Sequence, residues 1–319
     1  MAADRQLALI FPGQGCQHVG MGAALYERCP EARAVYQEAD DVLGYDLSSL
    51  CFEGPEAQLN DTANAQPAIV TTSLALWAAL RPRLNGMAAA VGYVAGHSLG
   101  EFSALAVAGA LTTADAIRLV RRRGLAMRAA GKANPGGMVA IIGLDDDAVR
   151  QIAADACGND GGCWVANYNS PGQVVIAGAT PAIERAISLA KACGARRALL
   201  LAVSVACHTV YMSQAAEQLN SALESVPFAR PWAPVVSNVT ASALSEPAEI
   251  KAALLRQLTS PVRWVEGIQY LADRGVTGTI EIGPKPVVSG LVARTNDAMR
   301  LSGITDPDSL EAFASEVQP

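Results

Sequence analysis

Short apolar runs alternate with longer segments of helical periodicity up to about residue 130. The first run, residues 7–11, is continuously apolar and stops at Pro12, which is typical of a strand buried on both faces of a sheet. The elements expected next are an apolar helix over 67–80, a strand over 91–95 and an Ala- and Leu-rich helix after Ser98. This alternation predicts an α/β fold with a parallel sheet.

The pattern changes between residues 132 and 203, where strands follow one another more closely. The expected elements are strands over 138–144, 164–168, 174–177 and 198–202, a helix capped by residues 145–147 and a helix opened by Thr180 and Pro181. This order, β-α-β-β-α-β, is the order of a ferredoxin-like domain.

The α/β pattern then resumes, with a strand over 235–239, two helices within 248–274 and a strand over 279–282. We therefore predict two domains. Residues 1–131 and 204–319 form a discontinuous large α/β domain, similar to the α/β hydrolases, and residues 132–203 form an inserted small ferredoxin-like domain.

Composition narrows the class of protein. Of the 319 residues, 51% are hydrophobic and 17% are charged, which is enough apolar material for a sizeable core. The net charge of -6 argues against a nucleic-acid-binding protein. No apolar run reaches the roughly 18–20 residues of a membrane span, and the N-terminal segment lacks a signal-peptide pattern. We expect a cytoplasmic protein that is not bound to a membrane.

Cysteine and histidine usage restricts the chemistry further. The seven cysteines include no Cys-x-x-Cys pair and no zinc-ligand spacing, so no metal is expected, and free thiols in a reducing compartment are predicted. The histidines are His18, His97 and His208, and any imidazole base must be one of these three.

Residues 96–100, Gly-His-Ser-Leu-Gly, match the nucleophile-elbow pattern G-x-S-x-G between a predicted strand and a predicted helix. The tight turn would expose the Ser98 hydroxyl at a helix N-terminus, where amide N–H groups can stabilise an oxyanion. The alternative is a serine in an ordinary glycine-rich turn.

Elimination favours His208 as the base for Ser98. His97 directly precedes Ser98, so the two side chains should diverge, and His18 lies in a loop after Gly-Gln-Gly. His208 follows the apolar run 199–205, which we interpret as a strand, and sites of α/β folds form at the C-terminal ends of strands. The alternative is a hydrogen-bonded core histidine.

Arg123 is the one charged residue within the apolar stripe of a predicted helix over 116–128. A buried guanidinium is costly unless it meets an anion. It would therefore either form a structural ion pair or bind the carboxylate of a substrate. Gln14 lies between two glycines after a buried strand, and its N–H is a candidate for a second oxyanion donor.

Four motifs occur in an order that resembles a known family. They are residues 11–15 (FPGQG), 96–101 (GHSLGE), 167–178 (NYNSPGQVVIAG) and 204–208 (SVACH). In this respect the chain is similar to the malonyl-CoA:acyl carrier protein transacylases of type II fatty-acid synthesis, from Phe11 to about Arg294.

The resemblance implies a role for each matching position. Ser98 would be the acylated nucleophile and His208 its base, the N–H groups of Gln14 and Leu99 would form the oxyanion hole, and Arg123 would bind the malonyl carboxylate. Two glutamines would support the site: Gln257 would orient His208 through its main-chain carbonyl, and Gln66 would lie near the acyl pocket.

The reaction implied is ping-pong transfer of malonyl from malonyl-CoA to the phosphopantetheine thiol of acyl carrier protein, by a monomer without a cofactor. Three positions depart from the family pattern: Cys16 replaces Ser or Ala, Ala206 and Cys207 replace Pro-Ser, and Lys285 replaces a glycine. The second departure bears on the choice of acyl group.

Three alternatives stay open at this point. A serine esterase or thioesterase would share the elbow, but no histidine follows His208, where esterases place theirs. A non-catalytic docking subunit would have no use for Ser98, His208 and Arg123. A discrete acyltransferase of a polyketide synthase would use the same chemistry in another pathway.

The acidic carrier protein would need a local basic patch on this acidic chain. The preferred patch is Lys191, Arg196 and Arg197, and the second choice is Arg121 and Arg122, followed by Lys285. Cys16 and Cys207 lie within two residues of predicted site residues, and either both line the cleft or both are inert buried thiols.

Overall fold

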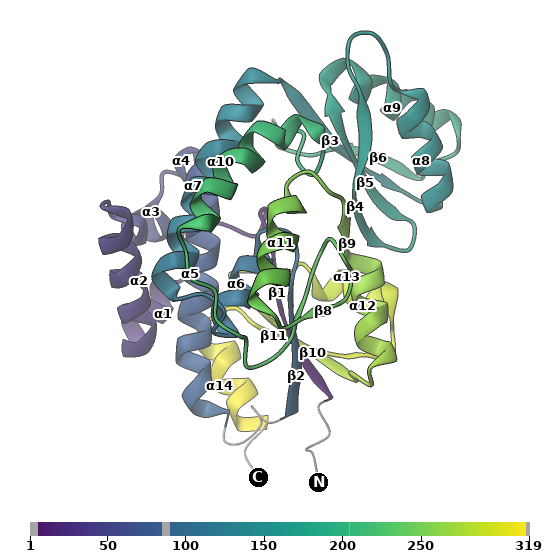
Figure 1. The fold of residues 1–319 in the computed structure, drawn as a ribbon. Helices are drawn as coiled ribbons and strands as arrows, with labels where there is room; N and C mark the ends of the chain where they lie inside the picture. Colours follow the sequence, from purple (N-terminus) through teal and green to yellow (C-terminus); the bar gives the residue numbers. More distant parts are fainter. Residues whose placement is uncertain (1–5, 85–89, 204, 317–319) are drawn as a thin grey trace.

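Two β-sheets organise the chain in the computed structural model, which describes residues 6–84, 90–203 and 205–316 (Figure 1). The larger sheet has six strands in the order β11-β10-β1-β2-β7-β8. These strands are β1 (Leu7–Phe11), β2 (Val91–Gly96), β7 (Val235–Val236), β8 (Ala243–Leu244), β10 (Gly278–Ile282) and β11 (Arg300–Ile304). All neighbours pair in parallel except β7 and β8.

The central strand β1 shows why its sequence is continuously apolar. Leu9 and Phe11 belong to the core on one face of the sheet, and Ala8 and Ile10 belong to the core on the other. A strand covered on both faces has no solvent-facing positions, so polar residues do not alternate along it.

Helices cover both faces of the larger sheet. The first core contains residues of α1 (Ala23–Arg28), α2 (Pro30–Leu43), α3 (Leu47–Glu53), α5 (Thr62–Leu80), α6 (Gly100–Val107), α7 (Thr113–Ala133), α10 (Ser213–Glu224), α11 (Pro247–Gln257) and α14 (Pro307–Glu316). The second contains residues of α12 (Trp264–Asp273) and α13 (Ser289–Thr295). Short helices α4 (Glu56–Leu59), η1 (Arg81–Arg83) and η3 (Val210–Met212) complete this part.

The smaller sheet has five strands in the order β6-β3-β5-β4-β9 and lies beside the larger one, with α8 and α9 on its outer side (Figure 1). Its elements are β3 (Gly136–Ile142), α8 (Asp146–Asp155), β4 (Cys163–Ser170), β5 (Gln173–Ala179), α9 (Thr180–Ala192), β6 (Arg197–Leu200) and β9 (Val262–Arg263). Alternate residues of β3 face the two sides: Val139 and Ile141 pack on the helices, and Met138 and Ala140 face inward.

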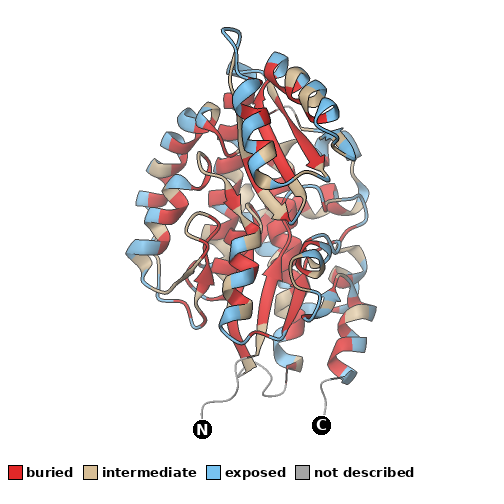
Figure 2. Ribbon diagram, turned by 90° about the vertical axis from the view of Figure 1, so that its right-hand side faces the viewer, coloured by how far each residue is buried: buried red, intermediate tan, exposed pale blue. Residues whose placement is uncertain are grey.

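The strand β9 comes from outside residues 132–203 and pairs in parallel with β4, so the smaller sheet includes a strand that the predicted insertion does not contain. The predicted division of the chain into domains stays a prediction, and its boundary residue 204 lies outside the described residues. Figure 2 shows the strands of both sheets largely buried, with exposed residues on the outer sides of the helices.

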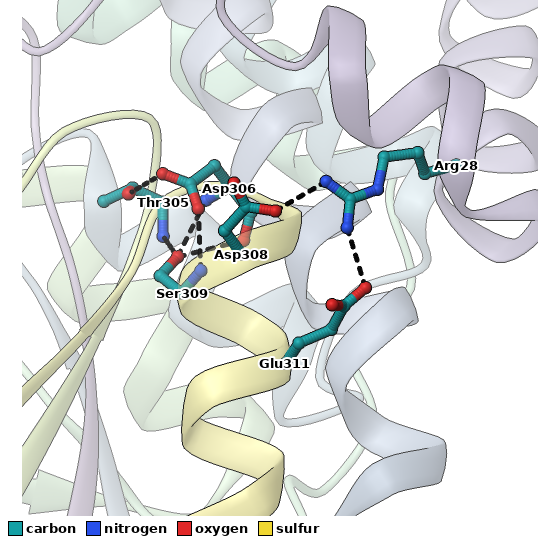
Figure 3. Close-up of polar contacts among 6 residues, drawn as sticks. All are labelled: Arg28, Thr305, Asp306, Asp308, Ser309 and Glu311. Atoms are coloured by element: carbon teal, nitrogen blue, oxygen red, sulfur yellow. Dashed lines mark hydrogen bonds and ion pairs between the residues drawn. The ribbon is translucent and has the colours of Figure 1, made fainter.

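The helix α14 contacts α1 through polar residues (Figure 3). Arg28 Nη1 lies 2.6 Å from Asp308 Oδ1, and Arg28 Nη2 lies 2.8 Å from Glu311 Oε1. Asp306 caps the helix by accepting the N–H of Ser309 at 2.8 Å. Exposed ion pairs contribute little to stability, so buried residues such as Leu310 hold the helix in place.

Most predicted elements are present, but several boundaries are wrong. The helix expected over 67–80 begins at Thr62, and the strand expected over 138–144 is Gly136–Ile142. The apolar run 199–205 is not a strand to its end, because β6 ends at Leu200, and Leu199 and Leu200 are exposed at the edge of the smaller sheet. The strand expected over 235–239 ends at Val236. The sequence reasoning also missed β11 and α10.

Candidate active site

Ser98 lies in the turn that joins β2 to α6, and its φ of 50° is in the left-handed region. The two glycines around it are required by close backbone contacts. A Cβ on Gly96 would lie 1.9 Å from the carbonyl carbon of Gly100, and a Cβ on Gly100 would lie 2.2 Å from the carbonyl oxygen of Phe11. The turn therefore has the geometry of a nucleophile elbow.

His208 and Ser98 are in hydrogen-bond contact, with 2.8 Å between Nε2 and Oγ. On the other side of the ring, Nδ1 lies 2.9 Å from the carbonyl oxygen of Gln257 and 3.1 Å from that of Ser260. Because carbonyl oxygens only accept, Nδ1 carries the proton and Nε2 keeps the lone pair that can accept the Ser98 proton. The Ser260 carbonyl was not predicted from the sequence.

The structure corrects the reason for which His208 was chosen. His208 does not follow the end of a strand but lies in the connection between β6, which ends at Leu200, and η3, which begins at Val210. Its φ is 61°. Burial, and secondly the charge of Arg123, lower the pKa of His208 to about 3, so the ring is neutral at physiological pH and available as a base.

Arg123 extends from α7 to the Ser98 hydroxyl, and its side chain is buried, with the residue only 2% exposed. Its Nη1 donates to Gln66 Oε1 at 2.8 Å, and its Nη2 donates to Ser98 Oγ at 3.1 Å and to Gln257 Oε1 at 3.2 Å. No carboxylate of the described residues lies within 4.0 Å of the guanidinium, so the expected structural ion pair is not found there.

The guanidinium of Arg123 also has one hydrogen-bond donor that is not used by the described residues. Its Nε has no hydrogen-bond partner in the described part of the chain. Burial lowers the pKa of Arg123 to about 10, which still leaves it charged at neutral pH. A buried positive charge with no acidic side chain of the described residues within 4.0 Å, in contact with a candidate nucleophile, fits a substrate that carries a carboxylate.

A cavity of about 240 Å³ opens at these three side chains, between the two sheets. Gln14 and Leu99 line it on the side of the larger sheet, and Cys207 lies beside His208. The remaining lining includes Met138, Asn167, Asn169, Gln173 and Val175 of the smaller sheet, with Leu201, Val203, Val205, Val287, Val288 and Leu291. A second hollow of about 600 Å³ shares Gln14, Val203 and Val205 with it and extends to Arg128 and Lys132.

Two further predicted residues lie near the cavity without lining it. Gln66 is fully buried behind Arg123, and its Nε2 donates to Thr62 Oγ1 at 2.9 Å and to Met127 Sδ at 3.2 Å. Cys16 is also buried, with its Sγ 3.2 Å from the Gly13 carbonyl oxygen. Only one of the two cysteines considered, Cys207, therefore lines the cavity.

Sequence reasoning missed three polar residues around the elbow. The Asn238 side chain accepts the N–H of Ser98, and Glu101 accepts from the Gln257 side chain. His97 Nε2 lies 2.8 Å from Asn169 Oδ1, which joins the elbow to the smaller sheet. The one usable signal was that Asn238 closely follows a strand, the position where sites of α/β folds form.

The basic residues proposed for docking differ in their surroundings. Arg121 is engaged inside the protein, since its Nη1 donates to the Ala63 carbonyl and to Asn64 Oδ1, both at 2.7 Å. Three of them are exposed close to one another in sequence: Lys191 near the end of α9, Arg196 in the connection that follows and Arg197 at the start of β6. Arg122 and Lys285 are exposed as well.

No cluster of three or more His, Cys, Asp or Glu side chains among the described residues could hold a metal ion. Across residues 6–84, 90–203 and 205–316, no helix is long and apolar enough to cross a membrane.

An elbow serine paired with a histidine beside a cavity suits acyl chemistry through a serine ester, and the comparisons with known proteins identify the class as acyl transferase. The family model described as "Acyl transferase domain" matches residues 8–313 of the sequence. The chain therefore belongs to this family. Its relatives include the malonyl CoA-acyl carrier protein transacylase of Bacillus subtilis (strain 168), which is 44% identical over 306 residues, with 96% of this chain and 95% of the relative covered. The resemblance found in the sequence is thereby confirmed.

Solved structures agree with this assignment. An acyl carrier protein S-malonyltransferase from Vibrio cholerae is 43% identical with a TM-score of 0.89, and the match covers 97% of this chain and 99% of that one. A malonyl-transacylase solved in complex with a type II PKS acyl-carrier protein is 41% identical with a TM-score of 0.92, covering 98% and 99% of the two chains.

Proposed function

We propose that this acyltransferase moves a malonyl group from malonyl-CoA to the phosphopantetheine thiol of acyl carrier protein, supplying extender units for fatty-acid synthesis. The observation that carries the proposal is the position of Arg123: a buried guanidinium without an acidic partner among the described residues, 3.1 Å from the Ser98 hydroxyl. A neutral acyl group would leave the guanidinium without a carboxylate in direct contact, whereas malonyl brings one to it. The relatives named above support the same substrate.

The first half-reaction forms a malonyl ester on Ser98. His208 Nε2 takes the proton as Ser98 Oγ attacks the thioester carbonyl, and the new oxygen–carbon bond replaces the carbon–sulfur bond. The proton then passes from His208 to the departing sulfur, so free coenzyme A leaves. The N–H groups of Gln14 and Leu99, which line the cavity, would hold the negative oxygen of the intermediate.

The second half-reaction reverses the first with another thiol. His208 takes the proton of the phosphopantetheine thiol, the sulfur attacks the Ser98 ester, and the proton is returned to Ser98 Oγ. Neither half needs a metal or a dissociable cofactor, because the histidine moves every proton and the pantetheine belongs to the partner. The Nδ1 contacts with the Gln257 and Ser260 carbonyls would keep the ring oriented throughout.

Bound malonyl would also change the basicity of His208. Arg123 lowers the pKa of His208 in the free protein. A carboxylate on Arg123 would offset that positive charge, so the imidazolium formed during attack would be less unfavourable. Binding the correct acyl group would therefore strengthen the base, and an acetyl group would not.

A second candidate function is acyl transfer to the carrier of a polyketide synthase. The solved neighbour in complex with a type II PKS acyl-carrier protein favours it. The two functions differ in the carrier that is loaded and not in the chemistry.

The proposal also covers the domain organisation of the chain, its oligomeric state and its location in the cell. The strand order β6-β3-β5-β4 and the antiparallel pairing support the description of residues 132–203 as a ferredoxin-like insertion in a hydrolase-like α/β domain. We further propose that the enzyme acts as a monomer in the cytoplasm, where coenzyme A thioesters and carrier proteins are found together.

Intact-mass measurement tests the function. The protein mixed with malonyl-CoA should gain one malonyl group, and addition of phosphopantetheinylated acyl carrier protein should remove it. Ser98→Ala should gain none. An equal adduct on Ser98→Ala, or release as free malonate without loading of the carrier, would contradict transfer through Ser98. Carriers of fatty-acid and polyketide synthesis, supplied in competition, separate the two functions.

A further inference from the structure

Both peptide groups of Ser98 are held by buried side-chain amides. The Ser98 N–H donates to Asn238 Oδ1 at 2.6 Å. The Ser98 carbonyl accepts Gln257 Nε2 at 3.0 Å, in addition to the N–H of Glu101 at 3.2 Å. A non-glycine residue with a φ of 50° is strained, so this conformation persists only because surrounding contacts offset its cost.

The Asn238 amide spans the turn. While its Oδ1 accepts from Ser98, its Nδ2 donates to the Gly96 carbonyl at 2.7 Å. These two partners lie on either side of His97. The Ser98 N–H needs an acceptor, and the Gly96 carbonyl needs a donor. The amide therefore has a single orientation, and that orientation matches the backbone of the elbow.

One carboxylate oxygen joins the two amide residues. Glu101 Oε2 accepts Gln257 Nε2 at 2.6 Å and the main-chain N–H of Asn238 at 3.4 Å. With both Nε2 protons of Gln257 used by Glu101 and Ser98, its Oε1 is left to face Arg123 at 3.2 Å. Glu101 is only 3% exposed, so these contacts are buried.

We infer that Glu101 and Asn238 are positioning residues for the nucleophile: with Gln257 they form a buried polar frame that keeps Ser98 in its left-handed conformation and its Oγ aligned with His208 and Arg123. The inference deepens the proposed function and rests on it for the role of Ser98. Neither residue lines the cavity, so each acts through Ser98 and not on the acyl group. An error of about 1 Å in the position of a reacting atom costs about 10²-fold in rate.

Two substitutions of similar shape separate the acceptor oxygen from packing at position 101. Glu101→Gln keeps an oxygen for Gln257 and Asn238, whereas Glu101→Met keeps the length of the side chain but replaces both oxygens with a thioether sulfur, a much weaker acceptor. Asn238→Ala removes the second part of the frame. The control is Ser103→Ala, on the same helix, because the buried Ser103 hydroxyl has no hydrogen-bond partner among the described residues.

Two rates are measured for each variant, with thermal unfolding to verify the fold. One is labelling of Ser98 by a small neutral fluorophosphonate, and the other is formation of the malonyl adduct over a range of malonyl-CoA concentrations. Glu101→Met and Asn238→Ala should lower both rates by about 10²-fold. The malonyl-CoA concentration that gives half the maximal rate should change by less than about 3-fold, because acyl binding is left intact. Glu101→Gln and Ser103→Ala should stay within about 5-fold of wild type.

Unchanged labelling of Asn238→Ala would overturn the inference, as would equal losses in Glu101→Gln and Glu101→Met. If Glu101→Met does not fold, Asn238→Ala with its control decides the matter. A wild-type protein that is labelled by the fluorophosphonate but not malonylated would refute the proposed function, while the labelling rates would still test the frame.

Discussion

Ser98 and His208, whose Oγ and Nε2 atoms lie 2.8 Å apart, both have positive φ angles, of 50° and 61°. Among the described non-glycine residues only Ala241 shares this feature. Such backbone conformations cost about 1–3 kcal/mol each and persist where the surroundings impose them. The two residues that carry the proposed proton transfer are thus both held by their neighbours in unfavourable conformations.

Removal of the base should slow acylation strongly while leaving malonyl-CoA binding in place. His208→Ala is expected to lower the rate of malonyl-Ser98 formation by about 10²–10⁴-fold, the usual contribution of a general base. Rapid-quench intact-mass measurement follows this rate. His97→Ala is the comparison, since His97 contacts Asn169 and not Ser98 Oγ. A rate near wild type in His208→Ala would remove His208 from the mechanism.

Arg123 should set the preference for a dicarboxylic acyl group. Arg123→Ala is expected to lower kcat/KM for malonyl-CoA by about 10–100-fold, equivalent to about 1.5–3 kcal/mol for hydrogen bonds to a charged group. Transfer of acetyl should fall less, or rise. Arg122→Ala, an exposed neighbour on the same helix, serves as the control. Equal losses for malonyl and acetyl would make Arg123 a structural residue.

The buried neutral state of His208 should appear in the pH dependence of stability. Its pKa is about 3 in the folded protein and 6.5 as the ordinary value, so between these limits the unfolded chain binds more protons. The contribution of His208 to the free energy of unfolding is therefore fully present above about pH 6.5, and it is lost as the pH falls from there toward about 3. Urea unfolding at several pH values should show a steeper acid decline for wild type than for His208→Gln. Parallel curves would contradict the assignment.

The cysteine that lines the cavity should respond to the acyl group. Burial raises the pKa of Cys207 to about 11 and that of Cys16 to about 12, so both should react slowly with iodoacetamide at neutral pH. Malonylation of Ser98 should slow alkylation of Cys207 further and leave Cys16 unchanged, as peptide mass mapping can measure. Equal alkylation of Cys207 with and without the acyl group would argue that it does not face the acyl chain.

Charge reversal of Lys191, Arg196 and Arg197 tests the preferred docking patch. Glutamate at all three positions should raise the KM for acyl carrier protein and weaken its salt dependence, because attraction to an acidic partner is lost. The rate of Ser98 malonylation by malonyl-CoA should not change. Reversal of Arg274 and Arg300, exposed beside the larger sheet, is the matched control. An unaffected KM would move the patch to Arg122 and Lys285.

The elements nearest to the nucleophile could be predicted because their causes are local. The apolar run of β1 and the glycines of the elbow are contiguous in sequence, and each needs only its own neighbours to be interpreted. Arg123 was found because one charge interrupted a helical stripe. These are patterns that a window of a few residues contains.

The misplaced strand before His208 has a physical explanation. Leu201, Val203 and Val205 are apolar because they line the cavity, and not because they belong to a strand. An apolar run has the same appearance in both cases. Asn238 and Glu101 were missed for another reason: they meet the elbow or each other across 140 and 137 positions of sequence, and no local pattern records such a pairing.

The segment after α11 has a mechanical consequence. Gln257, the last residue of α11, and Ser260 hold the His208 ring through their carbonyls, and the chain then continues directly into β9, which is paired with β4 of the smaller sheet. Asn167, at the β4–β9 pairing, also lines the cavity. The Ser260 carbonyl that holds the ring therefore lies two residues before a strand paired with the smaller sheet, and a shift of that sheet would move this hydrogen-bond acceptor. Loading of the carrier therefore requires the smaller sheet to stay in place while the pantetheine arm is bound, because the same two hydrogen bonds orient His208 in both half-reactions.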